Sequence, residues 1–532
     1  MANPKNIISK FIKATQSEKE VEAFLKTLLP GTKFEGKVKA VGGYVRDEYL
    51  SIIKNDPSIE SKDLDILVAM KNGSKKLSEY IYNVFNNPNI WSRVKHLFSD
   101  IKNSPVSKPR QMGKGYPIWQ ITFKEDITYK DKKYKTKGAV IEFADTMTEE
   151  YPDPNSRQRK VKYAPLEKDI ERRDFTVNML LKDMTTGEIE DFTGTSKEDI
   201  KKGVLKGHPT VSLDKTFSED PLRMLRLIRF QAKYGWKIPG SVLKTVKRNA
   251  SRINTVSSER ITEELKKIAK YGKMKTATQL MSATGLLKHI YPEIEALKGV
   301  KQPEKHHQEG DVYRHTLKVL KNAPPGIENQ MAALLHDIGK PSTQELIEDT
   351  ITFRKHEDLG AELAEAVMKR LKFDNTTTKK VKNMVKNHMR PHNLGPDPST
   401  KSIRKFVREV GDEAVDSILD LANADALGKI PEDKYIPDLK KKIEKALKEQ
   451  PVKKKSILDG KEIMSLLNLK SGPQVGKAKK TLQEIEDSYA EKGETLTKDR
   501  AKEELKKHFK KTASIISVSD YIRKISLETE KY

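Results

Sequence analysis

The sequence predicts an α+β protein in which an N-terminal region with a mixed β-sheet is followed by helical regions. Two patterns lead to this prediction. Short apolar or alternating runs at residues 38–41 and 63–68 are typical of strands. From Phe217 onward, apolar residues recur at helical spacing instead. A chain of 532 residues is also too long for one hydrophobic core, so several domains are expected.

The patterns divide the chain into five expected regions. Residues 1–35 form an N-terminal helical extension that ends at Pro30-Gly31. Residues 36–200 form a mixed-sheet head, and residues 201–300 form a helical neck. A polar run at 299–310 marks the boundary between this neck and a helical region at 301–430 that is rich in histidine and aspartate, and residues 431–532 form a basic helical tail.

The composition of the chain indicates a polyanionic partner. The formal net charge is +26 at pH 7, and this excess of lysine and arginine favours RNA or DNA over a membrane surface. The alternative is that the charge reflects a lysine-rich proteome and is merely solvated. The sequence contains no cysteine, which excludes disulfides and thiolate metal sites. No apolar run approaches the ~20 residues that span a bilayer, so we expect a soluble, cytoplasmic protein with no membrane partner.

Residues 41–47 and 63–68 together outline a site for a metal and a triphosphate. Gly42 and Gly43 allow phosphate oxygens to approach the backbone closely, and Arg46 adds a positive charge. Asp63 and Asp65 are two residues apart in a predicted strand. Their carboxylates therefore share one face of that strand and can hold a divalent cation.

Glu142 is the candidate third carboxylate of this site. It lies between Ile141 and Phe143 in an otherwise apolar predicted strand. A carboxylate at such a position is costly to bury unless a metal or another cation meets it. Because an Asp-x-Asp strand is predicted nearby, we favour a metal ligand. The alternative is a surface residue on an edge strand.

Arg172, Arg173, Asp174 and Asn178 form a second polar motif. The paired arginines offer cationic donors for phosphate, while the aspartate and asparagine offer acceptors for a ribose hydroxyl. The alternative interpretation is a surface cluster of ion pairs.

Asp220 and Arg223 lie three residues apart at the start of a predicted helix and so share one helix face. Adenine and cytosine both present an amino donor beside a ring-nitrogen acceptor, whereas guanine and uracil present the reverse. An aspartate acceptor beside an arginine donor could therefore select A and C. The alternative is that Asp220 is the N-cap before Pro221 and makes a local salt bridge with Arg223.

Residues 311–428 carry a different set of chemical groups, again in helical context. The adjacent pair His336-Asp337 follows an apolar stretch that buries the helix and fixes where the imidazole lies. One buried histidine would usually be structural, but a whole series of metal-ligand residue types is harder to explain in that way. Histidine and carboxylate ligands together suit Mn, Fe, Co, Ni or Zn better than Mg or Ca. The candidate set is His315, His336, Asp337, His356, His388 and Asp425.

Taken in order, these motifs resemble those of the class II tRNA nucleotidyltransferase (CCA-adding enzyme) and poly(A) polymerase family, with an HD phosphohydrolase domain attached. The resemblance covers residues 38–482. Each motif is weak alone, but the ordered series is specific. The series is Gly42-Gly43 with Arg46-Asp47, Asp63-x-Asp65, Arg172-Arg173-Asp174 with Asn178, Asp191-x-x-Gly194, Glu219-Asp220-x-x-Arg223, and Ser258-Glu259-Arg260.

The resemblance implies a nucleotidyltransferase head at 36–200, a neck at 201–300 that binds RNA and nucleotide, and an HD domain at 301–430. It implies that Asp63 and Asp65 bind Mg²⁺ and form the catalytic set with Glu142. It also implies that Asp220 and Arg223 serve as a protein template for C and A. The full implied nucleotide-binding set is Gly42, Gly43, Arg46, Arg172, Arg173, Asp174, Asn178, Asp220, Arg223 and Arg226.

For the HD domain, the resemblance implies one metal site and a candidate second one. His315, His336, Asp337 and Asp425 match the metal pattern, and His356 and His388 are candidate ligands of a second ion. The metal expected there is a transition metal such as Mn, Ni, Co or Fe.

The expected function is CCA addition, in which CMP and AMP from CTP and ATP are joined to the 3′ end of tRNA. HD-domain phosphohydrolase activity on RNA ends is a candidate second activity. The alternatives are a poly(A) polymerase acting on other RNAs, and a protein that is mainly an HD phosphohydrolase with an RNA-binding head. The chain departs from the family pattern at Met147, where members often carry arginine, and in residues 71–138, which are longer than usual.

Overall fold

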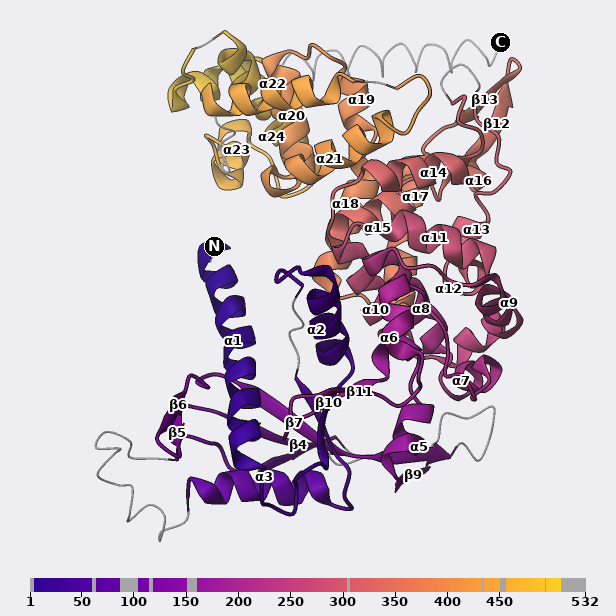
Figure 1. The fold of residues 1–532 in the computed structure, drawn as a ribbon. Helices are drawn as coiled ribbons and strands as arrows, with labels where there is room; N and C mark the ends of the chain where they lie inside the picture. Colours follow the sequence, from indigo (N-terminus) through magenta and orange to yellow (C-terminus); the bar gives the residue numbers. More distant parts are fainter. Residues whose placement is uncertain are drawn as a thin grey trace. The chain divides into compact units, whose positions relative to one another are not determined.

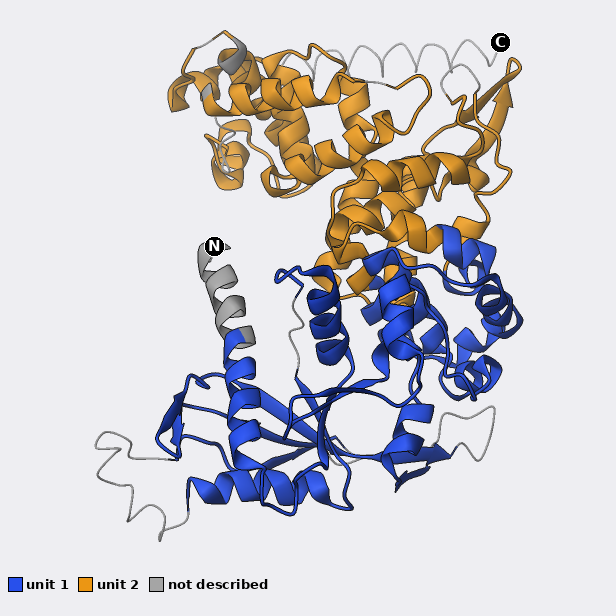
Figure 2. Cartoon of the chain, in the orientation of Figure 1, with its two compact units in different colours: residues 1–265, 279–290 blue, residues 266–278, 291–532 orange. Residues whose placement is uncertain are grey.

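The computed structural model describes residues 4–59, 64–86, 104–113, 118–150, 160–303, 307–432, 434–449, 456–492 and 494–508. The chain forms two compact units, which Figure 2 distinguishes by colour: residues 1–265 with 279–290, and residues 266–278 with 291–532. The first unit holds the large sheet and the second is almost entirely helical, which confirms the predicted α+β class. Within the described residues, no helix has both the length and the apolar character that crossing a membrane requires.

A seven-stranded mixed sheet forms the centre of the first unit. Every neighbouring pair of strands is antiparallel except β2 with β7, which run parallel in the middle of the sheet. The predicted strands at 38–41 and 63–68 correspond to β1 and β2, although Asp63 itself lies outside the described residues. In spatial order the strands are β11 (Ile189–Asp191), β10 (Leu180–Asp183), β1 (Val38–Val41), β2 (Asp65–Val68), β7 (Val140–Asp145), β4 (Ile118–Thr122) and β3 (Arg110–Met112).

Three helices and a small hairpin surround this sheet (Figure 1). The helices are α1 (Pro4–Leu28), α2 (Gly43–Lys54) and α3 (Gly73–Val84), and the hairpin consists of β5 (Ile127–Tyr129) and β6 (Lys132–Tyr134). The hairpin packs against α1, where the ring of Phe24 meets those of Tyr129 and Tyr134 edge-on at 5.6 and 5.8 Å. The chain turns between β5 and β6 at Lys130 and Asp131, which have positive φ angles.

Short elements and then longer helices complete the first unit. The hairpin of β8 and β9 precedes the loop that carries the second polar motif, and the helices from α7 onward confirm the helical pattern predicted after Phe217. These elements are β8 (Met147–Glu150), β9 (Lys160–Tyr163), α5 (Leu166–Glu171), η2 (Thr176–Asn178), α6 (Ser196–Lys202), α7 (Leu213–Glu219), α8 (Leu222–Tyr234), α9 (Gly240–Asn249), η3 (Ala250–Thr255), α10 (Ser258–Lys270), α11 (Met274–Ala283) and α12 (Leu287–Ile290).

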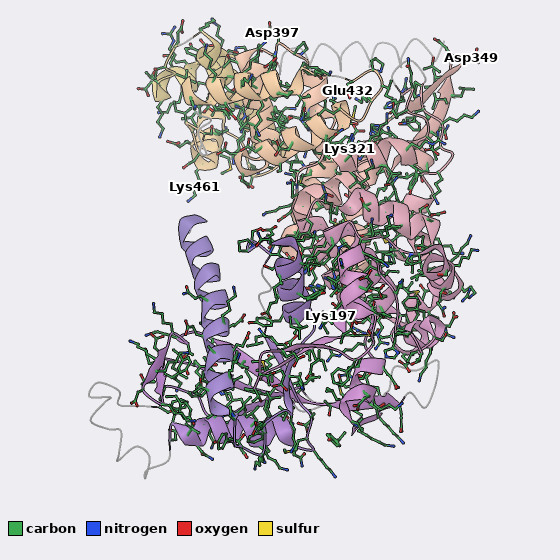
Figure 3. All side chains as sticks on the ribbon, in the orientation of Figure 1. Lys197, Lys321, Asp349, Asp397, Glu432 and Lys461 are labelled. Atoms are coloured by element: carbon green, nitrogen blue, oxygen red, sulfur yellow. The ribbon has the colours of Figure 1, made fainter. Side chains whose placement is uncertain are left out.

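The second unit is a helical bundle in which α14 packs against α15 and α21, and α18 packs against α15 and α17. One hairpin interrupts the helices, and Figure 3 shows Asp349 at its tip, between β12 and β13. The elements of the bundle are α13 (Pro292–Glu295), α14 (Val312–Asn322), α15 (Ile327–Leu335), α16 (Lys340–Thr343), β12 (Gln344–Ile347), β13 (Thr350–Phe353), α17 (His356–Arg370), α18 (Asn375–Asn387), α19 (Arg390–Leu394), α20 (Thr400–Val410), η4 (Asp412–Ala414) and α21 (Val415–Ala426).

The tail consists of α22 (Ile436–Glu449), α23 (Gly460–Leu467) and α24 (Pro473–Glu491). Apolar side chains from 458–505 form a core of their own, which includes Ile463 and Leu482. Asp459 starts α23 with a capping box, because its carboxylate accepts from the first-turn amides while Glu462 accepts from the amide of Asp459. The tail contacts α20 through α24, because Arg404 and Arg408 of α20 both donate to the buried carboxylate of Asp487 on α24.

Candidate active site and metal centre

Asp65 and Glu142 lie side by side at the centre of the sheet. Asp65 begins β2 and is aligned with Glu142 in the parallel register of β2 and β7. The flanking residues of both carboxylates are buried, whereas Asp65 is exposed and Glu142 is half-buried. Gln120 on β4 donates to Glu142 Oε1 at 3.0 Å. The strand patterns therefore present both carboxylates on the same face, as the sequence predicted for Glu142 beside this strand.

This pair of carboxylates suits a hard divalent cation. Both side chains offer oxygen atoms, the ligands that Mg²⁺ prefers, and neither is sealed from solvent. Asp63, the expected second member of the Asp-x-Asp motif, lies outside the described residues.

The glycine turn begins next to these carboxylates, because Val41 at the end of β1 pairs with Asp65. Gly42 has a φ angle of 71°, a conformation that L side chains rarely adopt. It stands at the N-terminus of α2, where no side chain among the described residues caps the helix. The first amides of a twelve-residue helix are thus left for an anion to approach, which fits the phosphate contact predicted for Gly42 and Gly43.

Arg46, which the resemblance places in the nucleotide-binding set, is buried, and its guanidinium group contacts protein partners. It donates to Asp47 Oδ1 at 2.7 Å, to Asn178 Oδ1 at 2.6 Å and to the Tyr234 hydroxyl at 2.6 Å. Arg46 therefore supports the glycine turn from the protein interior.

Asp174 is also held by protein groups. Asn178 donates to its Oδ1 at 2.8 Å, and Arg226 Nη2 lies 2.6 Å from its Oδ2. Burial alone would raise the pKa of Asp174, but the Arg226 guanidinium and the Asn178 amide hold that pKa well below its usual range. The carboxylate is thus a fixed anion that orients Arg226, whose side chain remains one-third exposed.

Arg172 and Arg173 both donate to the carboxylate of Asp169, a residue for which the sequence predicts no role. Asp169 is fully buried and accepts from Arg172 Nη2 at 2.8 Å and from Arg173 Nη2 at 3.0 Å. Spacings of three and four residues on a helix could have revealed these pairs. Arg172 also donates to the backbone oxygen of Met147, the position where the family pattern would place an arginine.

The hydrogen-bond partners of Asp220 and Arg223 come from several elements. Asp220 accepts two hydrogen bonds from Arg260 on α10, at 3.2 and 2.7 Å. Arg223 donates to the backbone oxygens of Thr216 and Arg172. Arg223 also forms an ion pair with Glu219, four residues earlier, at 3.5 Å. Asp220 Oδ1 accepts from the amide of Leu222 at the start of α8 at 3.3 Å, while Pro221 occupies the N-cap position of that helix.

The sequence places Arg260 in the Ser258-Glu259-Arg260 motif but does not predict its contact with Asp220. Its partner is forty residues away, so no local spacing reveals the contact. Arg226 and Arg229 on α8 likewise pair with carboxylates from other elements, Asp174 and Glu264. The base-selecting region predicted around α8 is thus braced by ion pairs on several sides.

The second unit contains a buried cluster of imidazoles and carboxylates on α14, α15, α17, α18 and α21. Among the described residues, three groups of ligand atoms are close enough to share an ion. Two consist of the predicted residues: His315 with His336 and Asp425, and Asp337 with His356 and His388; the third is His307 with Glu309 and His315. All six predicted side chains are buried. The structure therefore brings together every residue that the sequence predicted for the HD site.

Backbone carbonyls orient three of these imidazoles in the same way. The Nδ1 atoms of His336, His356 and His388 lie 2.9, 2.8 and 2.6 Å from backbone oxygens three residues earlier. An Nδ1–H that donates to a carbonyl leaves the Nε2 lone pair pointing into the cluster, which is the arrangement found in metal-bound histidines. Burial and the neighbouring His336 and His356 lower the pKa of His388 to about 3, so this ring is neutral near pH 7.

The carboxylate of Asp337 contacts histidines of both groups of predicted residues. Its Oδ2 is 3.1 Å from His336 Nε2, and its Oδ1 is 3.4 Å from His356 Nε2. Within the described residues, His336 Nε2 is buried and forms no hydrogen bond of good geometry. A buried polar atom rarely lacks a partner, so this nitrogen fits a ligand such as a metal ion. Mixed histidine and carboxylate donors suit a transition metal, which these side chains would hold.

Gly339 allows the two halves of this cluster to meet. A Cβ atom at Gly339 would lie 2.2 Å from the backbone oxygen of His356. Only a glycine lets α17 start this close to the turn that carries Asp337.

Several residues of the cluster were not predicted. Glu309 accepts from His307 Nδ1 at 2.7 Å and from His315 Nδ1 at 3.0 Å, and so orients His315 toward Asp425. His392 Nε2 lies 2.8 Å from Asp425 Oδ2. Lys340 Nζ lies 2.8 Å from Asp337 Oδ2, at the three-residue spacing that could have revealed it.

Comparison with family models places three domains along the chain. Residues 99–206 match the poly A polymerase head domain, and residues 235–298 match the "probable RNA and SrmB-binding site of polymerase A". Residues 312–429 match the HD domain, which contains all six predicted metal-site residues.

Curated relatives show the same similarity. The chain is 30% identical over 337 residues to the A-adding tRNA nucleotidyltransferase of Deinococcus radiodurans, covering 60% of this chain and 75% of the relative. It is 29% identical over 363 residues to the CC-adding tRNA nucleotidyltransferase of Thermus thermophilus, covering 65% and 79%. It is 33% identical over 210 residues to the multifunctional CCA protein of Nitrosococcus oceani, but this match covers 38% of the chain and only half of that relative.

Solved structures with the same fold have lower identity. The crystal structure of the Bacillus stearothermophilus CCA-adding enzyme in complex with CTP superposes with a TM-score of 0.58 at 17% identity, covering 94% of this chain and 99% of that one. The Thermotoga maritima CCA-adding enzyme complexed with tRNA has a TM-score of 0.52 at 18% identity, covering 96% of each chain.

Proposed function

The chain belongs to the class II tRNA nucleotidyltransferase and poly(A) polymerase family and carries an HD domain, and on this premise we propose that it adds CMP and AMP from CTP and ATP to the 3′ end of tRNA. The observation that carries the proposal is the alignment of Asp65 with Glu142 directly beside the glycine turn. The net charge of +26 supports an RNA partner.

In the proposed reaction, the 3′-hydroxyl oxygen of the RNA bonds to the α-phosphorus of the nucleotide and pyrophosphate leaves. Asp65 and Glu142, with Asp63, would hold Mg²⁺, which when bound activates the hydroxyl and neutralises charge on the leaving group. The amides at the start of α2 would donate to the phosphate oxygens, because Gly42 keeps their approach open. Arg46 would act indirectly by bracing this turn.

Selection of C and A would depend on Asp220 and Arg223. Asp220 would accept from the exocyclic amino group of the base, and Arg260 holds its carboxylate in one orientation. A guanidinium group has five N–H donors, so Arg223 has more donors than its contacts with Thr216, Arg172 and Glu219 require, and one of them would serve a ring nitrogen. Guanine and uracil would place a donor against Arg223 and an acceptor against Asp220.

The relatives include enzymes named for CC addition and for A addition, so the test must separate these activities. Purified full-length protein is given labelled CTP and ATP with three tRNA substrates, lacking CCA, CA or only the terminal A, and the products are sequenced. Complete CCA on all three substrates supports the proposal. Addition of only CC or only A would replace it with the narrower activity, and long A tails without C incorporation would favour the poly(A) alternative.

A second function is supported by the buried HD cluster. We propose that it hydrolyses phosphate esters at RNA ends, such as a 2′,3′-cyclic phosphate, with one or two transition-metal ions. Such an ion, when bound, supplies an activated water as nucleophile. His315, His336 and Asp425 would hold one ion, His356 and His388 a second, and Asp337 would bridge them.

The two activities can be separated in the full-length protein. His336→Ala is expected to abolish hydrolysis of an RNA 2′,3′-cyclic phosphate and to leave nucleotide addition unchanged, whereas Glu142→Gln should do the reverse. Elemental analysis of the wild type after incubation with Mn, Co, Ni or Fe should show bound metal that His336→Ala reduces. Absence of bound metal in the wild type would contradict the second function without affecting the first.

A further inference from the structure

We propose that Tyr234 is a positioning residue for the incoming nucleotide, because its hydroxyl fastens the glycine turn at residues 42–47 to the helix that carries Arg226. This inference rests on the proposed nucleotide site. The turn lies at the start of α2, whereas Tyr234 ends α8 and is 188 residues away from Arg46 along the chain. Nothing in the local sequence connects these two elements.

The Tyr234 hydroxyl makes all three hydrogen bonds that it can form. We refer to this hydroxyl and the charged residues linked to it, Arg46, Asp47, Lys233, Asp174 and Arg226, as the joint. A phenolic hydroxyl has one donor and two acceptor lone pairs. It donates to Asp47 Oδ1 at 2.9 Å, and it accepts from Arg46 Nη2 at 2.6 Å and from Lys233 Nζ at 2.7 Å. Removing this single oxygen would therefore loosen three charged side chains at once.

The contacts continue from this hydroxyl to the predicted ribose- and phosphate-binding motif. Arg46 donates to Asn178 Oδ1, Asn178 donates to Asp174 Oδ1 at 2.8 Å, and Asp174 accepts from Arg226 Nε at 2.8 Å. The result is one hydrogen-bonded chain that runs from the glycine turn through the η2 loop and back to α8. A shift at either end would be transmitted to the other.

Aromatic packing keeps the hydroxyl in place. The ring of Tyr234 stacks on Trp236 with centroids 4.5 Å apart and an interplanar angle of 20°. The Arg46 guanidinium lies over the rings of Tyr234 and Phe230, at 4.9 and 5.3 Å from their centroids. Because these contacts involve the rings, they remain when only the hydroxyl is removed.

The charge of the joint also suits an anionic ligand. Its members include three cations, Arg46, Lys233 and Arg226, against two carboxylates, Asp47 and Asp174. One positive charge is left next to the turn whose amides are open to phosphate. The hydroxyl bridges these charges without adding a charge of its own.

The test is Tyr234→Phe in the full-length protein. Dissociation constants for CTP and ATP, measured by calorimetry, are expected to rise about tenfold and by the same factor for both nucleotides, because the turn and not the base contact is loosened. Affinity for tRNA should stay within about twofold. Asp47→Asn, which weakens the acceptor and keeps the side-chain volume, should produce a similar loss.

The control is Tyr134→Phe. This tyrosine is fully buried in the first unit, whereas Tyr234 is half-buried. The Tyr134 hydroxyl donates to Thr27 at 2.7 Å, away from Arg46 and Asp47. Its nucleotide affinities should match those of the wild type. Combining Tyr234→Phe with Asn178→Ala should weaken binding by less than the product of the single effects, because both residues hold Arg46.

Wild-type affinity for both nucleotides in Tyr234→Phe and Asp47→Asn, with or without a lower unfolding temperature, would overturn the positioning role. A wild-type protein that binds neither CTP nor ATP would instead overturn the proposed nucleotide site and this inference with it. The two failures are distinguishable because one appears in the variants and the other in the wild type.

Discussion

Replacing Arg260 with alanine is expected to relax base selection while leaving the fold intact. Arg260 Nη1 and Nη2 contact the two carboxylate oxygens of Asp220 at 3.2 and 2.7 Å. Without these two hydrogen bonds from Arg260, the Asp220 carboxylate can rotate. A rotated carboxylate can accept a hydrogen bond from water or from a base that presents its donors in another position. The preference for an amino group at that position should therefore weaken.

The expected cost in stability is small. The Arg260 side chain is 40% exposed and that of Asp220 is 22% exposed, so solvent screens their attraction. Pairs of this kind contribute about 0.2 to 1 kcal/mol to stability. The effect on selectivity should be larger, because a correctly placed hydrogen bond to a charged group is worth about 1.5 to 3 kcal/mol. Loss of half to two-thirds of that discrimination gives about 1 to 2 kcal/mol, a five- to thirtyfold change in the ratio of kcat/KM values.

The assay compares ATP with GTP, and CTP with UTP, on tRNA substrates prepared for each addition step, alongside thermal unfolding. Arg248→Ala serves as the matched control, because Arg248 forms a similar exposed ion pair with Asp214 at 2.8 Å in the same unit. That variant should keep wild-type selectivity.

Unchanged selectivity in Arg260→Ala, together with a clear fall in unfolding temperature, would refute the reasoning and make Arg260 a structural residue only. A loss of activity that is equal for all four nucleotides would also refute it, because a free carboxylate should affect the choice of base.

Three further outcomes follow from other parts of the structure. Glu142→Gln should lower kcat for nucleotide addition by at least about a hundredfold without changing tRNA affinity. Glu125→Gln, which removes an exposed ion pair with Lys137, should leave kcat unchanged. Equal rates in the two variants would contradict the metal-binding role of Glu142. Glu309→Gln should weaken metal binding to the HD cluster about ten- to a hundredfold in calorimetric titration, because it orients His315; unchanged affinity would remove that role. Asp174 has a depressed pKa, so its contribution to stability is present above the unfolded value of about 3.9 and is lost as pH falls through the folded value. The difference in the free energy of unfolding between wild type and Asp174→Asn, measured in urea at several pH values, should therefore shrink below about pH 4, and a constant difference would count against this linkage.

The sequence predicted well those features that depend on local pattern. Apolar and alternating runs located β1 and β2, and the polar residue in an apolar strand placed Glu142 beside Asp65, as the register of β2 and β7 confirms. The six HD residues were identified from residue type and order, and the structure gathers them in one buried cluster. In each case the chemistry and the periodicity point in the same direction.

Partners that come from distant elements were beyond such reasoning. The three-residue spacing of Asp220 and Arg223 gives no sign of Arg260, which the packing of α10 brings to Asp220. The charge of Arg46 indicates a phosphate contact but gives no sign of Tyr234, which α8 brings to it. Local spacing states which residues could meet along one element. It does not indicate which distant helix packs against that element and supplies the partner.

The parallel pairing of β2 with β7 has a consequence for how this family member could acquire its long segment at residues 71–138. Two parallel neighbours need a crossover connection, and here that connection contains α3, β3, β4 and the β5–β6 hairpin. The entropy of closing a loop grows only slowly with its length. Evolution can therefore lengthen this excursion, or an engineer can insert a reporter in it, while the register that sets Asp65 against Glu142 is maintained by the strands at either end.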